Sequence, residues 1–135
     1  MKDVVSIAID ASHDVVERLF GDPTLTSRWM KDMSYEPGAS ASTYRLVSTS
    51  GGMSFDVTVA GKHRLILEAP NVTVKVDARM TALSPLKTLL VSEETFRFKG
   101  LIGRVFGALS KRSIHRAHSE QMERFKAFAE QWRAS

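Results

Sequence analysis

The chain has 135 residues, of which 43% are hydrophobic and 25% charged, and its net charge at pH 7 is +4. This length and balance predict a single folded domain over residues 1–135 and exclude wholesale disorder. The absence of cysteine excludes disulfide frameworks, thiol catalysis and cysteine-ligated metal sites. The opening MKDVVSIAID lacks the apolar stretch of a signal peptide, and no run approaches the roughly 20 apolar residues of a membrane span. We therefore expect a cytoplasmic protein without integral membrane association.

The first quarter of the chain predicts a strand followed by two short helices. Val4–Asp10 alternates apolar and polar residues, as a half-buried strand does. Ser12 fits the N-cap of the first helix, because its hydroxyl can accept from a free backbone N–H. Asp22 and Pro23 suit the start of the second helix, as cap and first-turn residue, and Trp29 lies on its apolar side.

From about residue 32 the hydrophobic period changes to two, which predicts a meander of five or six strands. Short turns rich in Gly and Pro separate these strands, so neighbours should pair antiparallel with one face in water. Within one strand, Val74 and Val76 should be buried, while Lys75 and Asp77 should face solvent. The predicted strands are Met33–Glu36, Thr43–Thr49, Met53–Val59, Arg64–Glu68, Val72–Ala82 and Lys87–Phe98.

Residues 101–132 predict one long helix that is irregular at its start. Its apolar stripe recurs at steps of three or four residues, through Ile114, His118, Met122, Phe125, Ala129 and Trp132. It is the only long amphipathic element available to cover the apolar face of the sheet, so the fold class is α+β. The first strand can pair with the last only if the sheet curls.

Three stretches carry a resemblance to a known superfamily: the opening from Ile7 to Ser12, the segment from Asp22 to Trp29, and the tail from Met122 to Phe128. They resemble the SRPBCC or START-like helix-grip superfamily, in particular its polyketide cyclase/dehydrase-like branch. The resemblance implies a curved antiparallel sheet of six to seven strands wrapped around the C-terminal helix, with two short helices after the first strand. It also implies a cavity for lipids, sterols, polyketides, quinones or plant hormones. The matching residues report fold and include no catalytic signature, so function does not follow from them alone.

Glu94 is the most informative polar residue of the last strand. If alternation holds, it shares an apolar, interior face with Leu90, Ser92, Phe96 and Phe98. An interior carboxylate has a raised pKa or needs a partner, and could orient a polar ligand head or act as a general acid or base. Alternatively, a bulge at Glu93 and Glu94 would place both side chains outside.

Other residues have both a binding and a structural interpretation. Trp29 could contact ligand and Arg28 could pair with an acidic group, or Trp29 could plug the core beside a surface Arg28. Tyr44 could offer its hydroxyl to a ligand or serve as an ordinary core residue. We expect a cavity bordered by Arg28, Trp29, Tyr44, Phe55, Val76, Ser92, Glu94 and Met122, and we assign no catalytic residue.

The sequence predicts no metal site and no cofactor. His115 and His118 are close on the helix, but most metal sites need three or four ligands, so His118 is expected to be an ordinary stripe residue. There is no phosphate loop, dinucleotide fingerprint or defensible Ser/His/Asp grouping. The C-terminal helix lacks the interleaved aromatics of nucleic-acid binders.

The leading functional hypothesis is binding or carriage of a small hydrophobic ligand by a monomer or homodimer. The first alternative is a polyketide cyclase/dehydratase-type enzyme working in the same cavity. The second is a protein that contacts a partner or, peripherally, a membrane, because residues 99–135 hold eight Lys/Arg against three Asp/Glu. An inward Glu94 bonded to another polar group would favour the enzyme, and a purely apolar cavity the carrier.

Overall fold

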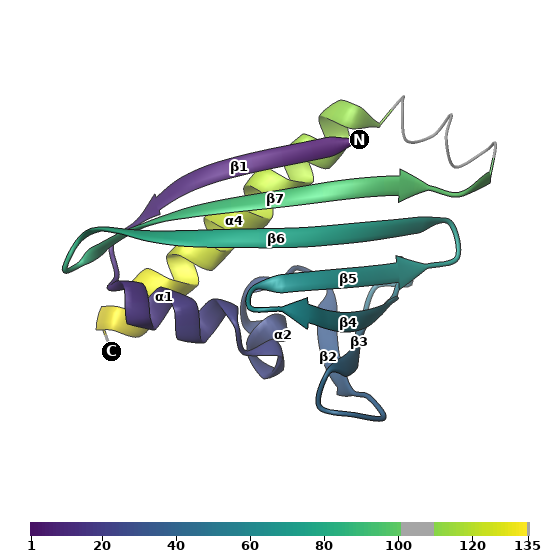
Figure 1. The fold of residues 1–135 in the computed structure, drawn as a ribbon, viewed down its shortest axis with the longest axis horizontal. Coiled ribbons are helices and arrows are strands. Elements are labelled where there is room, and N and C mark those ends of the chain that lie inside the picture. The colour runs from purple at the N-terminus through teal and green to yellow at the C-terminus, as the bar shows by residue number, and fades with distance from the viewer. Residues whose placement is uncertain (101–109, 135) are drawn as a thin grey trace.

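A computed structural model describes residues 1–100 and 110–134. One antiparallel sheet of seven strands dominates it, in the order β1-β7-β6-β5-β4-β3-β2 (Figure 1). The elements in chain order are β1 (Lys2–Ile9), α1 (His13–Phe20), the 3₁₀ turn η1 (Pro23–Leu25), α2 (Thr26–Trp29), β2 (Met33–Pro37), β3 (Thr43–Ser48), β4 (Phe55–Gly61), β5 (Arg64–Ala69), β6 (Val72–Ser84), β7 (Lys87–Phe98) and α4 (Lys111–Ala134).

The helices after β1 begin where the sequence predicted, for the expected physical reasons. The Ser12 hydroxyl accepts a 3.3 Å hydrogen bond from the backbone N–H of Val15 at the start of α1. The Asp22 carboxylate accepts one of 3.0 Å from the N–H of Thr24, and Pro23 occupies the first turn. These caps fix where the chain leaves β1 and turns under the sheet.

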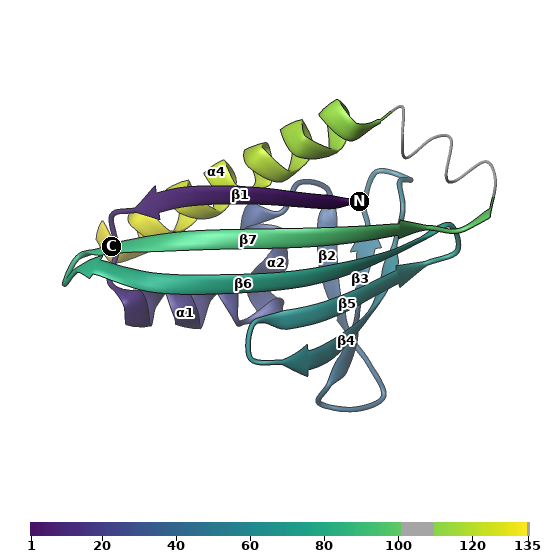
Figure 2. The same ribbon diagram turned by 45° about the horizontal axis from the view of Figure 1, so that its top comes forward.

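The sheet curves enough to bring the first strand beside the last. Strands β2 to β7 pair with their chain neighbours, and β1 pairs antiparallel with β7. Figure 2 shows β2 and β3 running steeply across the direction of β6 and β7. The sheet therefore curls as the pairing of first and last strand requires, and the expected curved sheet of six to seven strands has seven.

The predicted register of β6 holds. Val74 is buried and Lys75 is exposed. Val76 was expected to be buried but is only half-buried, because it borders a cavity. Asp77 is half-buried, and its side chain is 47% exposed and pairs with Arg64 at 3.4 Å.

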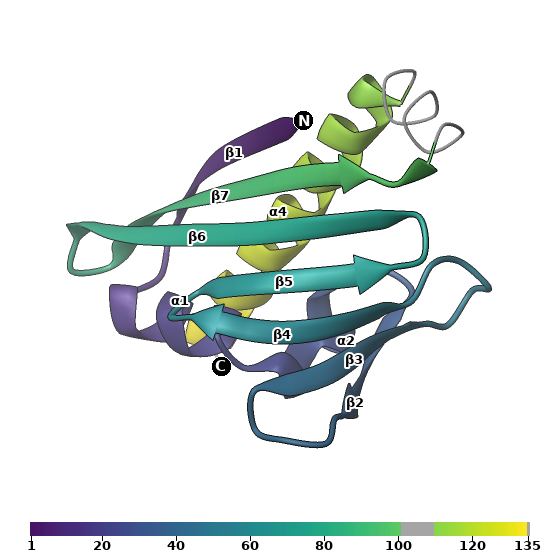
Figure 3. The ribbon, with the colours of Figure 1, turned by 45° about the vertical axis from the view of Figure 1, so that its right-hand side comes forward.

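Helix α4 crosses the concave face of the sheet, with α1 and α2 on that same face (Figure 3). His118, Met122, Phe125 and Ala129 are buried, so the predicted stripe is confirmed over these residues. Trp132 is 36% exposed, and it packs against Phe128 and the guanidinium of Arg18. The predicted start of the helix, at residues 101–109, lies outside the described residues.

The core consists of two apolar clusters. One joins α4, α1 and α2 to β1 and β7, and the ring of Phe125 lies at its centre, 5.1 Å from Phe20 and 5.0 Å from Trp29. The other covers the inner faces of β3 to β6, around Tyr44, Leu46 and Val57. A cavity is bordered by residues of both clusters.

Candidate functional site

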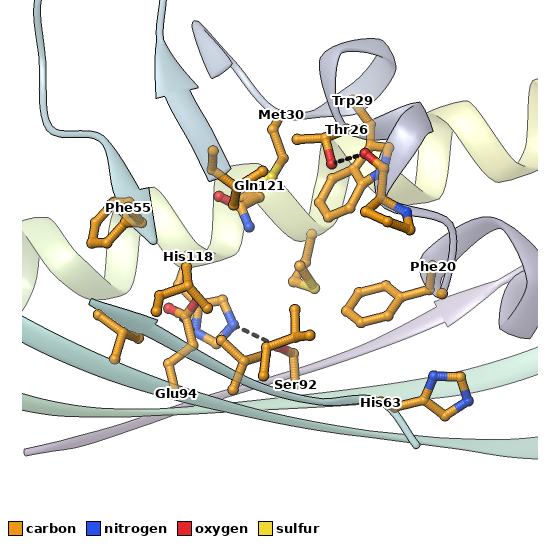
Figure 4. Close-up of a pocket in the computed structure, with 18 of the residues that line it drawn as sticks. Phe20, Thr26, Trp29, Met30, Phe55, His63, Ser92, Glu94, His118 and Gln121 are labelled. Atoms are coloured by element: carbon orange, nitrogen blue, oxygen red, sulfur yellow. Dashed lines mark hydrogen bonds and ion pairs between the residues drawn. The ribbon is translucent and has the colours of Figure 1, made fainter. Parts of the chain in front are cut away.

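The cavity between α4 and the concave face of the sheet has a volume of about 390 Å³. Apolar side chains from the short helices, the sheet and α4 form most of its wall, among them Phe20, Trp29, Leu46, Phe96 and Met122. Cavities of this size are in the range of small-molecule sites. Polar side chains are the minority, and three of them, Ser92, Glu94 and His118, lie close together (Figure 4).

The structure brings together seven of the eight predicted site residues. The cavity wall includes Trp29, Tyr44, Phe55, Val76, Ser92, Glu94 and Met122. Arg28 is not among the lining residues: it is exposed, and its guanidinium lies 5.4 Å from the centre of the Phe128 ring. Trp29 both lines the cavity and stacks on Phe20 at 5.8 Å, so it is a wall residue and a core residue at once.

Glu94 points into the cavity. Strand β7 pairs with β1 and β6 without a register shift at this position, placing Glu94 opposite Asp3 on one side and Val76 on the other. The alternative of a bulge at Glu93 and Glu94 is therefore wrong. The Glu94 side chain is 16% exposed, and its Oε1 lies 3.4 Å from Nδ1 of His118.

His118 is the centre of a buried polar cluster. Its side chain is fully buried, and its Nδ1 lies 2.8 Å from Oδ2 of Asp3 on β1. Its Nε2 lies 2.9 Å from Oγ of Ser92 on β7 (Figure 4). The other carboxylate oxygen of Asp3 lies 2.8 Å from Nδ1 of the exposed His115. We call Asp3, Ser92, Glu94 and His118 the polar cluster.

These contacts determine the hydrogen-bond direction along the cluster. A carboxylate only accepts, so Nδ1 of His118 donates to Asp3. In the neutral ring Nε2 then carries no proton and accepts from the Ser92 hydroxyl. Burial raises the pKa of the Glu94 carboxyl, with His118 opposing that effect and the Asp3 carboxylate adding to it.

Two further groups of the wall are hydrogen-bond donors. Burial, together with the neighbouring Tyr35, raises the pKa of the Tyr44 hydroxyl to about 12, so it keeps its proton at neutral pH. The indole N–H of Trp29 is buried and has no hydrogen-bond partner among the described residues. An unpaired buried donor costs about 1–3 kcal/mol, which a bound acceptor would offset.

The part of the cavity near α1 is bordered by a surface ion cluster. His63 and Gly21 line the cavity there, and Glu17 on α1 contacts Nζ of Lys62 at 3.2 Å and Nε2 of His63 at 3.5 Å. The hydrogen bond from Lys62 holds the pKa of Glu17 below its usual value. These contacts tie α1 to the turn between β4 and β5.

Comparison with known proteins identifies the fold. No family model and no curated protein matches the sequence. The structure is similar to that of a START superfamily protein from Mycobacterium smegmatis, with a TM-score of 0.71, 13% identity, and 97% of this chain and 98% of that chain covered. The chain has the START-like helix-grip fold.

Two other solved structures share this START-like fold. One is a conserved protein from Geobacillus kaustophilus, with a TM-score of 0.71, 17% identity, and 96% of this chain and 95% of that one covered. The other is the Zhui aromatase/cyclase from Streptomyces sp. R1128, with a TM-score of 0.63, 13% identity, and 92% and 93% covered. Over the described residues, no helix has both the length and the apolarity to cross a membrane.

Sequence reasoning missed the roles of two members of the polar cluster, Asp3 and His118, of which His118 lines the START-like cavity. Asp3 lies on the same inner face of β1 as Val5, Ile7 and Ile9. The predicted strand began at Val4 and therefore left Asp3 out. His118 was placed on the buried stripe without a polar partner. Over residues 1–100 and 110–134 no group of three His, Asp or Glu is arranged to hold a metal; His115 and His118 instead share Asp3.

Proposed function

We propose that the protein binds a small, largely apolar molecule carrying one neutral polar group, in the cavity between α4 and the sheet. The observation that carries this proposal is a mainly apolar cavity of about 390 Å³ whose wall includes Ser92, Glu94 and His118 of the polar cluster. Binding of a hydrophobic molecule stays a prediction. The cytoplasmic location and the monomeric or homodimeric state also stay predictions.

The size of the cavity supports occupancy. At roughly 24 cal/mol per Å³, an empty and dry cavity of about 390 Å³ would cost about 9 kcal/mol. That is comparable with the whole stability of an ordinary domain, about 5–15 kcal/mol. The cavity is therefore expected to hold ligand or water, and mainly apolar walls favour an apolar ligand over water.

The polar cluster supports a neutral head group on the ligand. Asp3 and Glu94 lie opposite each other on β1 and β7, so an anionic head placed beside them would meet negative charge. A hydroxyl group could instead donate to Glu94, and a carbonyl group could accept from the carboxamide N–H of Gln121, which lines the cavity from α4. A ligand with an alcohol, ketone or phenol at one end fits this arrangement best.

Direct binding of a neutral fluorescent probe tests the proposal. N-phenyl-1-naphthylamine should bind with a Kd below about 100 μM, equivalent to about −5.5 kcal/mol. Val76→Phe fills the cavity and should weaken binding at least tenfold, whereas Lys75→Phe adds the same ring on the outer face and should not. No binding at this concentration, or equal effects of the two variants, would contradict the proposal.

Head-group preference is tested with 1-decanol and decanoate as competitors of the same probe. Because the carboxylates of the cluster repel an anion, 1-decanol should displace the probe at a concentration at least tenfold lower. Glu94→Gln keeps the size of the side chain and removes one ionisable group. It should therefore reduce the ratio between the competing concentrations of decanoate and 1-decanol. Equal competition by alcohol and acid in the unaltered protein would show that the cluster does not face the ligand head.

An enzyme working in the same cavity is the second candidate. It is favoured by the inward Glu94 beside His118, since a buried carboxyl with a raised pKa is suited to proton transfer. The Zhui aromatase/cyclase has the same fold, although at 13% identity the likeness carries no chemistry by itself. Contact with a partner or membrane through α4 has less support, because Arg124 and Lys126 already pair with Glu120 and Glu130.

A further inference from the structure

Three residues of the polar cluster, Asp3, His118 and Ser92, form a hydrogen-bonded series. Binding of a ligand, as proposed above, does not require such a series. Oδ2 of Asp3 lies 2.8 Å from Nδ1 of His118, and Nε2 of the same ring lies 2.9 Å from Oγ of Ser92. The residues come from β1, α4 and β7, so only the complete fold brings them together. Ser92 lines the apolar cavity, so its hydroxyl borders the space where a ligand would lie.

We propose that Ser92, His118 and Asp3 act as nucleophile, general base and positioning residue, and that the cavity is an acyl-transfer site for small hydrophobic esters. This inference rests on the proposed function, because the acyl chain must enter the same cavity.

Geometry favours this role over that of an ordinary buried histidine. A serine hydroxyl is a weak nucleophile unless a base within hydrogen-bond reach takes its proton and a third group orients that base. Both distances here meet that requirement, and the Asp3 contact leaves Nε2 of the neutral ring free to accept the proton. The His118 side chain is fully buried, so its orientation is fixed by packing as well as by Asp3.

The reaction proceeds in two balanced steps. The Ser92 Oγ attacks the ester carbonyl carbon while its proton moves to Nε2 of His118; the bond from carbon to the alcohol oxygen breaks, and the alcohol leaves with that proton. Water then attacks the acyl-serine ester, again giving a proton to His118. The bond to Ser92 breaks, Ser92 regains the proton, and a carboxylic acid is released. Water is the only co-reactant.

The negative charge that develops on the carbonyl oxygen needs a hydrogen-bond donor in the cavity. The backbone N–H groups of β7 cannot be assumed free, because Ser92 pairs with Val5 on one side and Ala78 on the other. The carboxamide of Gln121 is the candidate donor, since it lines the cavity one helical turn after His118. Figure 4 shows Gln121 on the helix side, with Ser92 below it on the sheet.

The substrate class follows from the cavity. Its walls suit an aliphatic or aromatic acyl group, and its volume of about 390 Å³ excludes triglycerides and folded peptides. The two neighbouring carboxyl groups of Asp3 and Glu94 disfavour anionic esters, because an added negative charge there would have to be buried beside them. Neutral esters of medium-chain or aromatic acids are the expected substrates.

Covalent labelling of the full chain tests the nucleophile directly. An alkyl fluorophosphonate should phosphonylate Ser92 with loss of fluoride, giving one adduct per chain by intact mass and one modified peptide. Ser92→Ala should abolish the adduct. Ser6→Ala, which removes an exposed serine from neighbouring β1, should leave labelling unchanged. Labelling of a different serine, or none, overturns the proposal.

Hydrolysis of p-nitrophenyl hexanoate tests the base, the positioning residue and the donor. His118→Gln and Asp3→Asn should each lower kcat by about 100-fold or more, as expected for lost acid–base catalysis. Gln121→Met should lower it by about 100-fold for loss of the donor. A purely structural role for Asp3 would lower the melting temperature of Asp3→Asn and weaken probe binding, without a separate loss of kcat.

Binding of N-phenyl-1-naphthylamine, measured on the same samples, separates the two proposals. Probe binding with neither a Ser92 adduct nor ester hydrolysis above the Ser92→Ala background overturns the acyl-transfer site and leaves the binding function standing. Absence of probe binding, adduct and hydrolysis overturns both. Equal rates of hydrolysis by the unaltered protein and Ser92→Ala also overturn the acyl-transfer site, because the hydrolysis would then come from a group other than Ser92.

Discussion

Two carboxyl groups, those of Asp3 and Glu94, face the imidazole of His118 in the polar cluster. Asp3 and Glu94 are direct partners on antiparallel strands, an arrangement in which like charges destabilise the sheet. His118 lies against both, at 2.8 Å and 3.4 Å, and so provides the hydrogen-bond donor that allows them to lie close together. His118 thus offsets part of the cost of burying the two carboxyl groups, whereas each carboxyl adds to the cost of burying the other.

Replacing Glu94 should change how stability depends on pH. Its pKa is higher in the folded protein than in the unfolded chain, because it is buried. The folded state therefore holds the proton more tightly, and stability falls as pH rises through the interval between the unfolded and the folded pKa. Glu94→Gln removes this loss. The free energy of unfolding of the variant minus that of the unaltered protein should therefore be larger at pH 7 than at pH 4.

Urea unfolding of both proteins at a series of pH values measures this difference. Asp3 and His118 also face Glu94 and are present in both proteins, so the comparison isolates the effect of replacing the Glu94 carboxyl within the same cluster. A difference that stays constant between pH 4 and pH 7, or runs in the opposite direction, would show that Glu94 titrates as an exposed carboxyl.

At the scale of the elements, local sequence signals predicted most of the fold. Period-two patterns located the strands from β2 to β7, the Ser12 hydroxyl predicted the start of α1, and the apolar stripe predicted the buried face of α4. Each of these signals lies within one element, where periodicity and capping have a direct physical cause.

The polar cluster could not be predicted in the same way. Asp3 and His118 are 115 positions apart, and Ser92 and His118 are 26 apart. Their contact depends on the pairing register of β1 with β7 and on the angle at which α4 crosses the sheet. Extending the inward row of β1 by one residue would have placed Asp3 beside Glu94, but the distance from α4 would still have been unknown.

The register of β6 gives a matched test on one strand. Val74→Asp puts a charge into the buried cluster of β3 to β6 and should cost several kcal/mol of stability. Lys75→Asp puts the same side chain on the outer face, where surface substitutions change stability by about 0.5 kcal/mol or less. The midpoints of urea unfolding of the two variants measure this contrast, and similar midpoints would mean that the inner and outer faces are misassigned.

At the scale of the whole molecule, the cavity links stability to occupancy. A ligand that binds only the folded state adds RT ln(1 + [L]/Kd) to the free energy of unfolding, about 2.7 kcal/mol at one hundred times Kd. The helices on one side and the sheet on the other both border the cavity, so a ligand there would hold the two apolar clusters together.

Thermal unfolding with increasing 1-decanol should therefore show a rising midpoint. A shift of several degrees is expected near saturation, given about 2–8 °C per kcal/mol for domains of this general size. Val76→Phe should show a smaller shift because less cavity remains. Native mass spectrometry after gentle purification provides a separate check, since a co-purified ligand would appear as a mass that leaves on denaturation.

The pairing of β1 with β7 also has a kinetic consequence. It joins Ile9 to Thr88 and Asp3 to Glu94, segments about 80 to 90 positions apart, and such distant contacts slow folding because a long loop must close first. Until β1 docks, the 12-residue strand β7 presents an open edge on which a second chain could pair. The cluster of Asp3, Ser92 and His118 cannot exist in that intermediate. A nascent chain in which β1 has not docked, or a heated chain in which β1 has detached, would therefore lack this site. It would also be prone to aggregation although most of its strands were paired.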